Sequence, residues 1–324
     1  MTALLDSPEA ASAAQPSRRR LPALSSYSLA GVLLLLCLIA TASSDAFLTR
    51  DNLTNVLTQS SVIGILTVGM TFVILTGGID LSVGSMLAAC SIYMGLQHGS
   101  GGFVMLLASL FGGIVLGAVN GLAITWGRIV PFIATLAMFS SARGLALYMS
   151  DNTPITVSSS LIDDLGTKRV LGLPMPIYVF VVVAVVAWTV LNRTAFGRHV
   201  VAVGGNAEAA RASGIRVERV QFAVYVISGL CVGIGAVLLT GRLGSASPVI
   251  GSGYELDAIA AAVIGGAALK GGKGGIGGSV LGVLLFQVIF NLFNLLDVNT
   301  NLQNILKGVI ILAAVVLQRR TRKA

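Results

Sequence analysis

The sequence predicts an all-α, polytopic membrane protein with about ten transmembrane helices. Of its 324 residues, 55% are hydrophobic and only 10% are charged, and the mean hydropathy is +0.89. Soluble domains carry about 25% charged residues, so this composition excludes an ordinary water-soluble enzyme. The 39 glycines agree with this class, because glycine is frequent in packed membrane helices.

Ten apolar runs define the expected membrane segments. A span needs about 20 apolar residues to cross the hydrocarbon layer, and most of the runs approach that length. Leu81–Leu96 and Leu256–Leu269 are shorter, and each follows a glycine-rich interruption. We expect broken or re-entrant helices there, covered by protein or facing a water-filled cavity. In order, the runs are Leu24–Ala42, Val56–Thr76, Leu81–Leu96, Phe103–Thr125, Val130–Met149, Met175–Leu191, Phe222–Leu239, Leu256–Leu269, Ile276–Phe293 and Leu302–Leu317.

The first run has a second interpretation as a cleaved signal peptide. Ala40, Thr41 and Ala42 fit the small-x-small pattern of a cleavage site. The polar stretch before the run is long for a signal peptide, however, and it contains the cluster Arg18–Arg20. We therefore favour a retained first span with these arginines in the cytoplasm.

The positions of Lys and Arg predict the orientation in the membrane. With ten crossings both chain ends lie in the cytoplasm, and most of the 21 Lys and Arg residues then lie on that side. This agrees with the positive-inside rule. The net charge of +8 is therefore a topology signal, and we expect no nucleic-acid partner. The exceptions are Arg50, Lys168, Arg169 and Arg242 on the outer side, and Arg143 and Lys307 within spans.

This arrangement divides the chain into one membrane domain and two tails. Residues 1–26 form a cytoplasmic N-terminal tail, residues 27–317 the transmembrane domain, and residues 318–324 a basic cytoplasmic tail. Two connections are large enough to contact partners. They are a periplasmic loop at residues 150–173 and a cytoplasmic loop at residues 192–221.

A weak internal repeat indicates two inverted halves. An apolar span precedes the glycine-rich break Gly77–Ser85, and another precedes the similar break Gly251–Asp257. Paired interrupted segments in oppositely directed halves point to a transport pathway. Chance similarity between glycine-rich segments is the alternative. The polar residues of the two breaks include Asp80, Ser82, Tyr254, Glu255 and Asp257.

The cytoplasmic loop contains a predicted two-turn helix. Asn206 is a good N-cap, Ala207–Ser213 consists mostly of strong helix formers, and Gly214 is a natural stop. Such a short helix is marginal alone, so we expect it to pack either on its own protein or on a cytoplasmic partner. The segment comprises Gly204, Gly205, Asn206, Ala207, Glu208, Ala209, Ala210, Arg211, Ala212, Ser213 and Gly214.

Catalytic and nucleotide-binding motifs are absent from the sequence. Gly272–Gly277 matches G-x-G-x-x-G but joins two membrane segments, whereas the dinucleotide fingerprint needs a βαβ unit. Lys273 precedes Gly274 rather than Ser or Thr, so this is not a P-loop, and neither H-E-x-x-H nor G-x-S-x-G occurs. If ATP drives this protein, another chain hydrolyses it. The cysteines Cys37, Cys90 and Cys231 lie in apolar runs and are expected to be packing residues.

Charged residues in or beside the spans are candidate functional groups. Asp80, Arg143, Glu255, Asp257 and Lys307 are costly in lipid, so they should face a cavity or pair with one another. Asp80 and Asp257 could instead cap the helices that they precede. Amides in the last hairpin can bind hydroxylated ligands without the desolvation cost of a charge. We predict a translocation pathway that includes Asp80, Ser82, Tyr254, Glu255, Asp257 and Asn291.

Four segments carry a family resemblance. They are Thr71–Ser85 with the core ILTGGIDLSVGS, Gly197–Ile215 (GRHVVAVGGNAEAARASGI), Gly251–Gly266 (GSGYELDAIAAAVIGG) and Gly271–Gly282 (GGKGGIGGSVLG). In this order and spacing they resemble the ribose-type sugar permeases of bacterial ABC importers. The resemblance extends roughly from Phe47 to Leu317.

The resemblance implies a membrane subunit that works as a pair in the bacterial inner membrane, in contact with lipid. It implies two further partners, a cytoplasmic ATP-binding subunit and a periplasmic sugar-binding protein. ATP and Mg would be used by the partner ATPase, with no cofactor in this chain. Gly204–Ile215 matches the part of the family loop that couples to the ATPase.

Three functions follow as hypotheses. The favoured one is the permease subunit of an ABC importer for ribose or a related monosaccharide, with alternating access driven by a separate ATPase. An ion-coupled secondary sugar transporter, with Asp80, Glu255 or Asp257 as ion sites, is the alternative. A membrane-embedded enzyme is the third.

Overall fold

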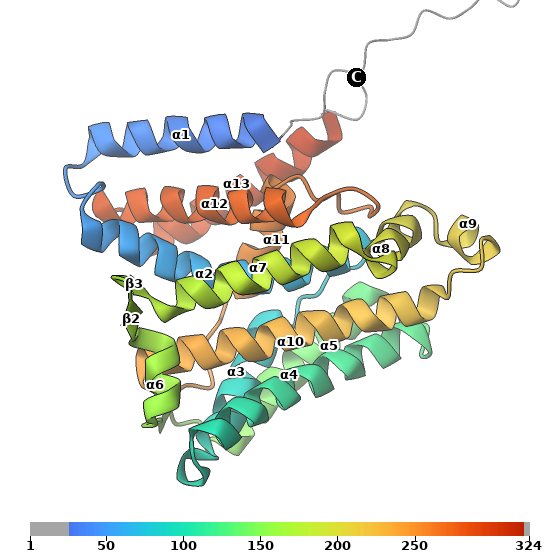
Figure 1. Cartoon of the computed structure of the whole chain (residues 1–324), viewed down its shortest axis with the longest axis horizontal. Helices are drawn as coiled ribbons and strands as arrows, with labels where there is room; N and C mark the ends of the chain where they lie inside the picture. Colours follow the sequence, from blue (N-terminus) through green and yellow to red (C-terminus); the bar gives the residue numbers. More distant parts are fainter. Residues whose placement is uncertain (1–25, 321–324) are drawn as a thin grey trace, which may run out of the picture.

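The computed structural model describes residues 26–320, and its chain is almost entirely helical (Figure 1). The all-α class expected from the sequence is therefore confirmed. The predicted tails lie largely outside the described residues, including Arg18–Arg20, Arg322 and Lys323. The helices are α1 (Ser26–Ser43), α2 (Arg50–Leu75), α3 (Val83–Gly95), α4 (Gly102–Thr125), α5 (Pro131–Met149), α6 (Ser160–Thr167), α7 (Met175–Arg193), α8 (Ala195–Gly205), α9 (Ala207–Ala212), α10 (Val217–Leu243), α11 (Tyr254–Ile264), α12 (Ile276–Leu295) and α13 (Thr300–Arg320). The described part also has a 3-10 turn, η1 (His98–Ser100), and the short strands β1 (Ile155–Thr156), β2 (Arg169–Val170), β3 (Leu173–Pro174) and β4 (Ser245–Ala246).

Six of the described helices are long and apolar enough to cross a membrane. They are α2, α4, α5, α7, α10 and α12, and they share one general direction in Figure 1. The two expected short segments are helices, but α3 has 13 residues and α11 has 11. Each is shorter than the roughly 20 residues that cross a hydrocarbon layer. The structure therefore gives six clear spans where the sequence predicts ten.

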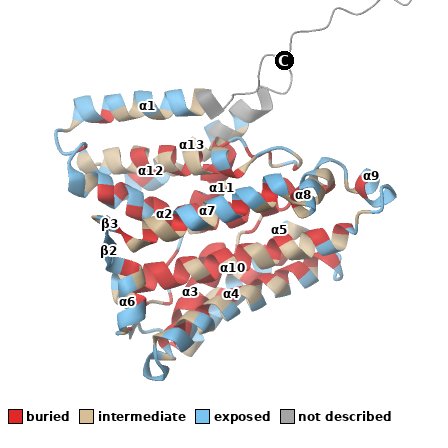
Figure 2. Cartoon of the chain, viewed as in Figure 1, coloured by how far each residue is buried: buried red, intermediate tan, exposed pale blue. Residues whose placement is uncertain are grey.

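Helix α2 lies at the centre of the bundle and is buried along most of its length (Figure 2). It is covered by α7, α10, α11 and α12. Its hydroxyl groups are satisfied within the helix, because Thr58, Thr67 and Thr71 each donate to the carbonyl oxygen four residues earlier. Thr71 also hydrogen-bonds Ser279 of α12 at 2.7 Å. These bonds remove most of the cost of burying polar groups.

Helices α4 and α10 pack closely because small residues face each other. Gly113 of α4 lies against the backbone of Gly229, where a methyl group would overlap a carbonyl oxygen. The Ser109 hydroxyl donates to the Gly233 carbonyl oxygen at 2.8 Å. Small residues of this kind let membrane helices approach each other closely.

Two interrupted helices are arranged in opposite directions. α2 continues through residues 76–82 into α3, and α10 continues through residues 244–253 into α11. α2 and α10 are antiparallel, since Gly235 contacts Leu66 whereas Gly69 contacts Ser228. The beginnings of α3 and α11 meet, and a methyl group on Gly84 would overlap the Gly251 carbonyl oxygen. This geometry agrees with the inverted halves expected from the sequence.

Some boundaries differ from the predicted runs. α10 starts at Val217, ahead of the predicted run, because Val217 and Val220 are already buried. α11 ends at Ile264 rather than Leu269, because Gly266, with φ of +91°, turns the chain. α8 is a helix that the sequence analysis did not predict. The two helices joined by the G-x-G-x-x-G segment approach closely, since the backbones of Gly265 and Gly278 are in contact.

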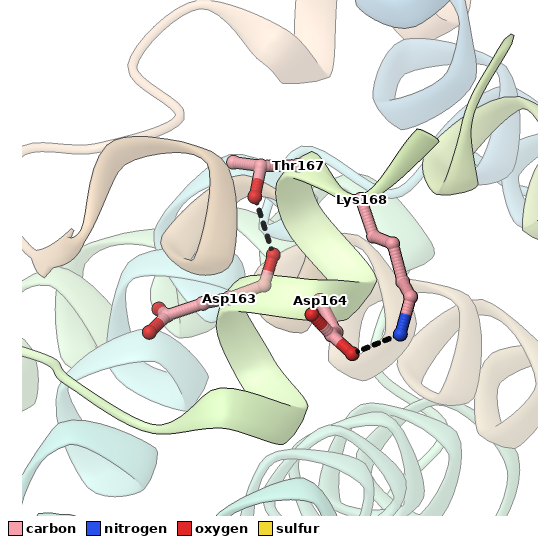
Figure 3. A network of polar contacts seen from close by, with 4 residues as sticks. All are labelled: Asp163, Asp164, Thr167 and Lys168. Carbon is pink, nitrogen blue, oxygen red and sulfur yellow. Dashed lines mark hydrogen bonds and ion pairs between the residues drawn. The ribbon is translucent and has the colours of Figure 1, made fainter. Parts of the chain in front are cut away.

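The connection at residues 150–173 is more ordered than a turn-rich loop. β1 pairs with β4, β2 pairs with β3, and α6 lies between β1 and β2 in sequence. Lys168, the residue after α6, forms an ion pair with Asp164 at 2.6 Å, and the Thr167 hydroxyl donates to the Asp163 carbonyl oxygen at 2.8 Å (Figure 3). α6 and α9 lie at opposite ends of the molecule (Figure 1).

Candidate functional site

The break between α2 and α3 is held by a buried polar network around Asp80. One carboxylate oxygen accepts hydrogen bonds from the Ser82 amide at 3.0 Å and the Ser82 hydroxyl at 2.5 Å. The other accepts from the Ser228 hydroxyl of α10 at 3.1 Å. Asn120 of α4 donates to the Ser82 hydroxyl at 2.9 Å. The fully buried carboxylate of Asp80 thus links the start of α3 to α10. Its bonds go to Ser82 and Ser228 rather than to the first-turn amides of α3, which has no side-chain cap.

Sequence reasoning missed two members of this network, Asn120 and Ser228, and the neighbouring Tyr225. All three lie within otherwise apolar helices. A polar side chain within a membrane helix was the available signal, because such groups are costly there unless they have a partner. The Tyr225 hydroxyl is buried beside Gly78 and has no hydrogen-bond partner among the described residues.

Arg143 of α5 holds the loop that leads into α11. Its guanidinium donates to the carbonyl oxygens of Pro248, at 2.6 Å, and Ile250, at 3.2 Å. It also attracts the carboxylate of Glu255, in the first turn of α11. One Glu255 oxygen lies against Gly84 of α3, without a hydrogen-bond partner among the described residues. Glu255 therefore lies where the two interrupted helices meet, and the positive ends of both helices favour its charge.

Asp257 of α11 forms an ion pair with Lys307 of α13, with 2.7 Å between the charged atoms. Lys307 also lies over the ring of Phe290, 5.4 Å from its centroid. The prediction that charges within the membrane region pair with one another is therefore confirmed for Asp257 and Lys307. Asp257 makes no capping bond, since α11 has no side-chain cap and Asp257 is already inside its first turn.

The other two predicted pathway residues, Tyr254 and Asn291, lie in different parts of the molecule. Tyr254 is the first residue of α11 and is half-buried. Asn291 of α12 makes a reciprocal amide pair with Asn52 of α2, with hydrogen bonds of 2.7 and 3.0 Å. This pair lies near the beginning of α2, whereas Asp80 follows its end. The structure thus brings Glu255 to the start of α3 but does not bring Asn291 to the same site.

The helix predicted at Ala207–Ser213 is confirmed as α9. The Asn206 side chain accepts a hydrogen bond from the Ala209 amide at 3.0 Å, and Gly214 has a φ of +83°. α9 protrudes from one end of the molecule (Figure 1). Ala210 is buried, while the other residues from Glu208 to Gly214 are exposed. Arg211 forms an ion pair with Glu218 of α10 at 2.6 Å.

A hollow of about 620 Å³ lies beside α9. Its polar lining includes Arg128, Arg211, Glu218 and Gln221.

Among the described residues, no group of three or more His, Cys, Asp or Glu could hold a metal ion. The three cysteines are free thiols, and Cys90 and Cys231 are buried as packing residues should be.

These features define a multi-pass membrane protein with paired interrupted helices. Residues 52–315 match the family described as "Branched-chain amino acid transport system / permease component", so the chain belongs to this family of transport permeases. Together with the relatives that the chain matches, this confirms the resemblance to ribose-type sugar permeases.

The relatives include permeases whose names state a sugar. The chain is 42% identical over 302 residues to the ribose import permease protein RbsC of Escherichia coli K12, covering 90% of this chain and 93% of that protein. It is 43% identical over 292 residues to RbsC of Bacillus subtilis 168, with coverages of 89% and 91%. The D-allose transport system permease protein AlsC of Escherichia coli K12 is 37% identical over 294 residues, with 90% of each chain covered. No solved structure matches the chain.

Proposed function

We propose that the chain is the permease subunit of a bacterial ABC importer that carries ribose or a related monosaccharide across the inner membrane. The observation that carries this proposal is the 42% identity with a ribose import permease over 90% of the chain. A relative named for D-allose extends the substrate class to other monosaccharides. The chain itself is not an enzyme in this proposal, because ATP hydrolysis belongs to a partner.

The surface around α9 supports a cytoplasmic ATP-binding subunit as that partner. α9 presents a small, largely exposed surface, with Ala209 and Ala212 facing outward. The hollow beside it adds a concave surface for a partner side chain. The sequence has no P-loop, which agrees with an ATPase that binds ATP and Mg on a separate chain. In this proposal residues 204–214 form the coupling segment.

The threading of the chain follows from the same proposal. The α9 end is cytoplasmic, and α6 and the β2–β3 pair face the periplasmic sugar-binding protein. α1, α3, α11 and α13 complete the ten predicted segments, with α3 and α11 as half-helices. The start of α1 and the end of α13 lie toward the α9 end in Figure 1, which supports cytoplasmic termini. The domain limits remain residues 1–26, 27–317 and 318–324. Two copies form the working unit, surrounded by lipid.

The pathway in this proposal runs past the meeting point of α3 and α11. Glu255 lies at that point against Gly84, and Tyr254 and Asp257 are its neighbours along α11. Asp80 and Ser82 stabilise the break between α2 and α3 through their hydrogen bonds. Asn291 lies near the other end of α12, where it bonds Asn52. Alternating access then requires that ATPase closure moves α9 and that this motion reaches the two half-helices.

Uptake by a reconstituted complex tests the function. The chain, its ATPase and its binding protein are placed in proteoliposomes with ATP inside, and labelled ribose and D-allose are offered outside. We expect uptake that requires ATP and the binding protein and that continues when an ionophore collapses ion gradients. Uptake that stops with the ionophore while ATP persists would instead support the ion-coupled alternative. Chemical conversion of the sugar by the isolated chain would support the enzyme hypothesis.

A further inference from the structure

Three distant segments meet backbone to backbone at the α9 end of the bundle. They are the end of α2 at Leu75, the end of α8 at Gly204, and residues Gly271 and Gly272 between α11 and α12. The Gly272 amide donates a hydrogen bond to the Leu75 carbonyl oxygen at 2.9 Å. A methyl group on Gly204 would overlap that same oxygen and would come within 2.6 Å of the Gly272 nitrogen. We call Leu75, Gly204, Gly271 and Gly272 the glycine junction.

The glycine junction depends on the absence of side chains. Gly271 and Gly272 have φ values of +86° and +72°, in the left-handed region that favours glycine. A methyl group on Gly271 would come within 2.7 Å of the Gly204 carbonyl oxygen and 2.9 Å of the Gly77 nitrogen. Close-packed contacts of this kind transmit displacement because they compress little. No side-chain rotamer lies between the three backbones to absorb a movement.

Each of the three chain segments that meet at the glycine junction continues into a segment with a proposed role. Gly204 is two residues before Asn206, which caps α9. Leu75 is the last residue of α2 and precedes the break that contains Asp80. Gly271 donates to the Ala268 carbonyl oxygen at 2.7 Å, and the Ala268 amide donates to the Lys273 carbonyl oxygen at 2.8 Å. These bonds brace the loop that follows α11.

We propose that the glycine junction is the route by which a displacement of α9 reaches both interrupted helices at once. This inference rests on the proposed function, in which an ATPase moves α9. Gly204 and Gly272 are then positioning residues: they hold the end of α8 against the end of α2 and against the loop after α11. One displacement is thereby delivered to the two half-helices that meet at Gly84 and Glu255.

Substitution of Gly204 tests the route in the complete reconstituted complex. In Gly204→Ala the methyl group must push α8 away from Leu75. We expect the ATPase to remain bound and to hydrolyse ATP, while sugar uptake per ATP falls about tenfold, in the range of measured coupling effects. Gly277→Ala is the matched control, since a methyl group there meets nothing within 4 Å, and its uptake per ATP should remain at the wild-type level. Wild-type uptake per ATP in Gly204→Ala would overturn the proposal.

Hydrogen exchange in the wild-type complex gives a second test that needs no variant. Binding of a non-hydrolysable ATP analogue should change exchange in peptides covering residues 206–213, 74–78 and 270–273 together. A change confined to residues 206–213 would overturn the route, and it decides the matter if Gly204→Ala fails to assemble. Absence of ATP-driven uptake or of ATPase binding in the wild type would contradict the proposed function itself, so the two failures are distinguishable.

Discussion

Lys307 and Asp257 form an ion pair between α13 and α11, with 2.7 Å between the ammonium nitrogen and the nearer carboxylate oxygen. Both side chains are largely buried, with exposed fractions of 19% and 10%. The pair therefore links α13 to α11, in a region where either charge alone is costly to bury.

Removal of one member of this pair should destabilise the protein more than removal of both. Lys307→Met leaves the Asp257 carboxylate buried without its counterion, at a cost of about 3–5 kcal/mol by analogy with other buried pairs. Lys307→Met combined with Asp257→Asn removes both charges and should recover most of that loss. Thermal unfolding of the purified variants in detergent measures the difference. A double variant no more stable than Lys307→Met would show that the charges act independently.

Asp80 should tolerate Asn far better than Ala. Asn keeps an oxygen for the Ser82 amide and hydroxyl, and its NH₂ group can donate to the Ser228 hydroxyl. Ala leaves these buried groups without their acceptor, which costs about 1–3 kcal/mol for each unsatisfied group. Expression level and sugar uptake, measured side by side, report the effect. Loss of uptake in well-expressed Asp80→Asn would point to an ionisable role and revive the ion-coupled alternative.

Arg143 should not be replaceable by Lys. Its guanidinium reaches two carbonyl oxygens, of Pro248 and Ile250, through a rigid fork that an ammonium group cannot copy. We expect Arg143→Ala to abolish most uptake and Arg143→Lys to retain only a minor part, because hydrogen bonds to charged groups contribute about 1.5–3 kcal/mol each. Uptake normalised to the amount of membrane-inserted protein is the measurement. Full activity of Arg143→Lys would mean that the charge alone suffices.

Ala209→Arg should prevent docking of the ATPase without disturbing the fold. Ala209 is exposed on α9, whereas its neighbour Ala210 is buried, so only the Ala209 substitution leaves the internal packing of α9 intact. We expect loss of ATPase co-purification together with loss of uptake. Leu171→Arg, at a residue 94% exposed toward the opposite end, is the control and should keep the ATPase bound. Normal co-purification with Ala209→Arg would place the docking surface elsewhere.

The sequence predicted those features that depend on local pattern. Apolar runs located the helices, and the Asn206 cap with the Gly214 stop located α9 to within a residue. Helix α8 was missed although Thr194 caps it, because Ala195–Gly205 is too short for a span and contains Arg198 and His199.

Partners distant in sequence could not be assigned from one sequence. The sequence predicted that Asp257 and Lys307 would need partners, but the pairing depends on how α13 lies against α11. Asn291 was expected in a pathway, and instead it pairs with Asn52 on a helix 239 residues away in sequence. The contact of Gly204 with Leu75 depends likewise on three chain segments converging, which no periodicity encodes.

The bonds between α2 and α12 make these two helices a single rigid unit. The reciprocal amides of Asn52 and Asn291 fix one end, and the hydroxyls of Thr71 and Ser279 fix the other. Because each amide both donates to and accepts from the other, the pair fixes the relative orientation of α2 and α12. A shift or rotation of one helix against the other would break several hydrogen bonds at once. We therefore expect a displacement that reaches α2 at Leu75 to carry α12 with it as one body.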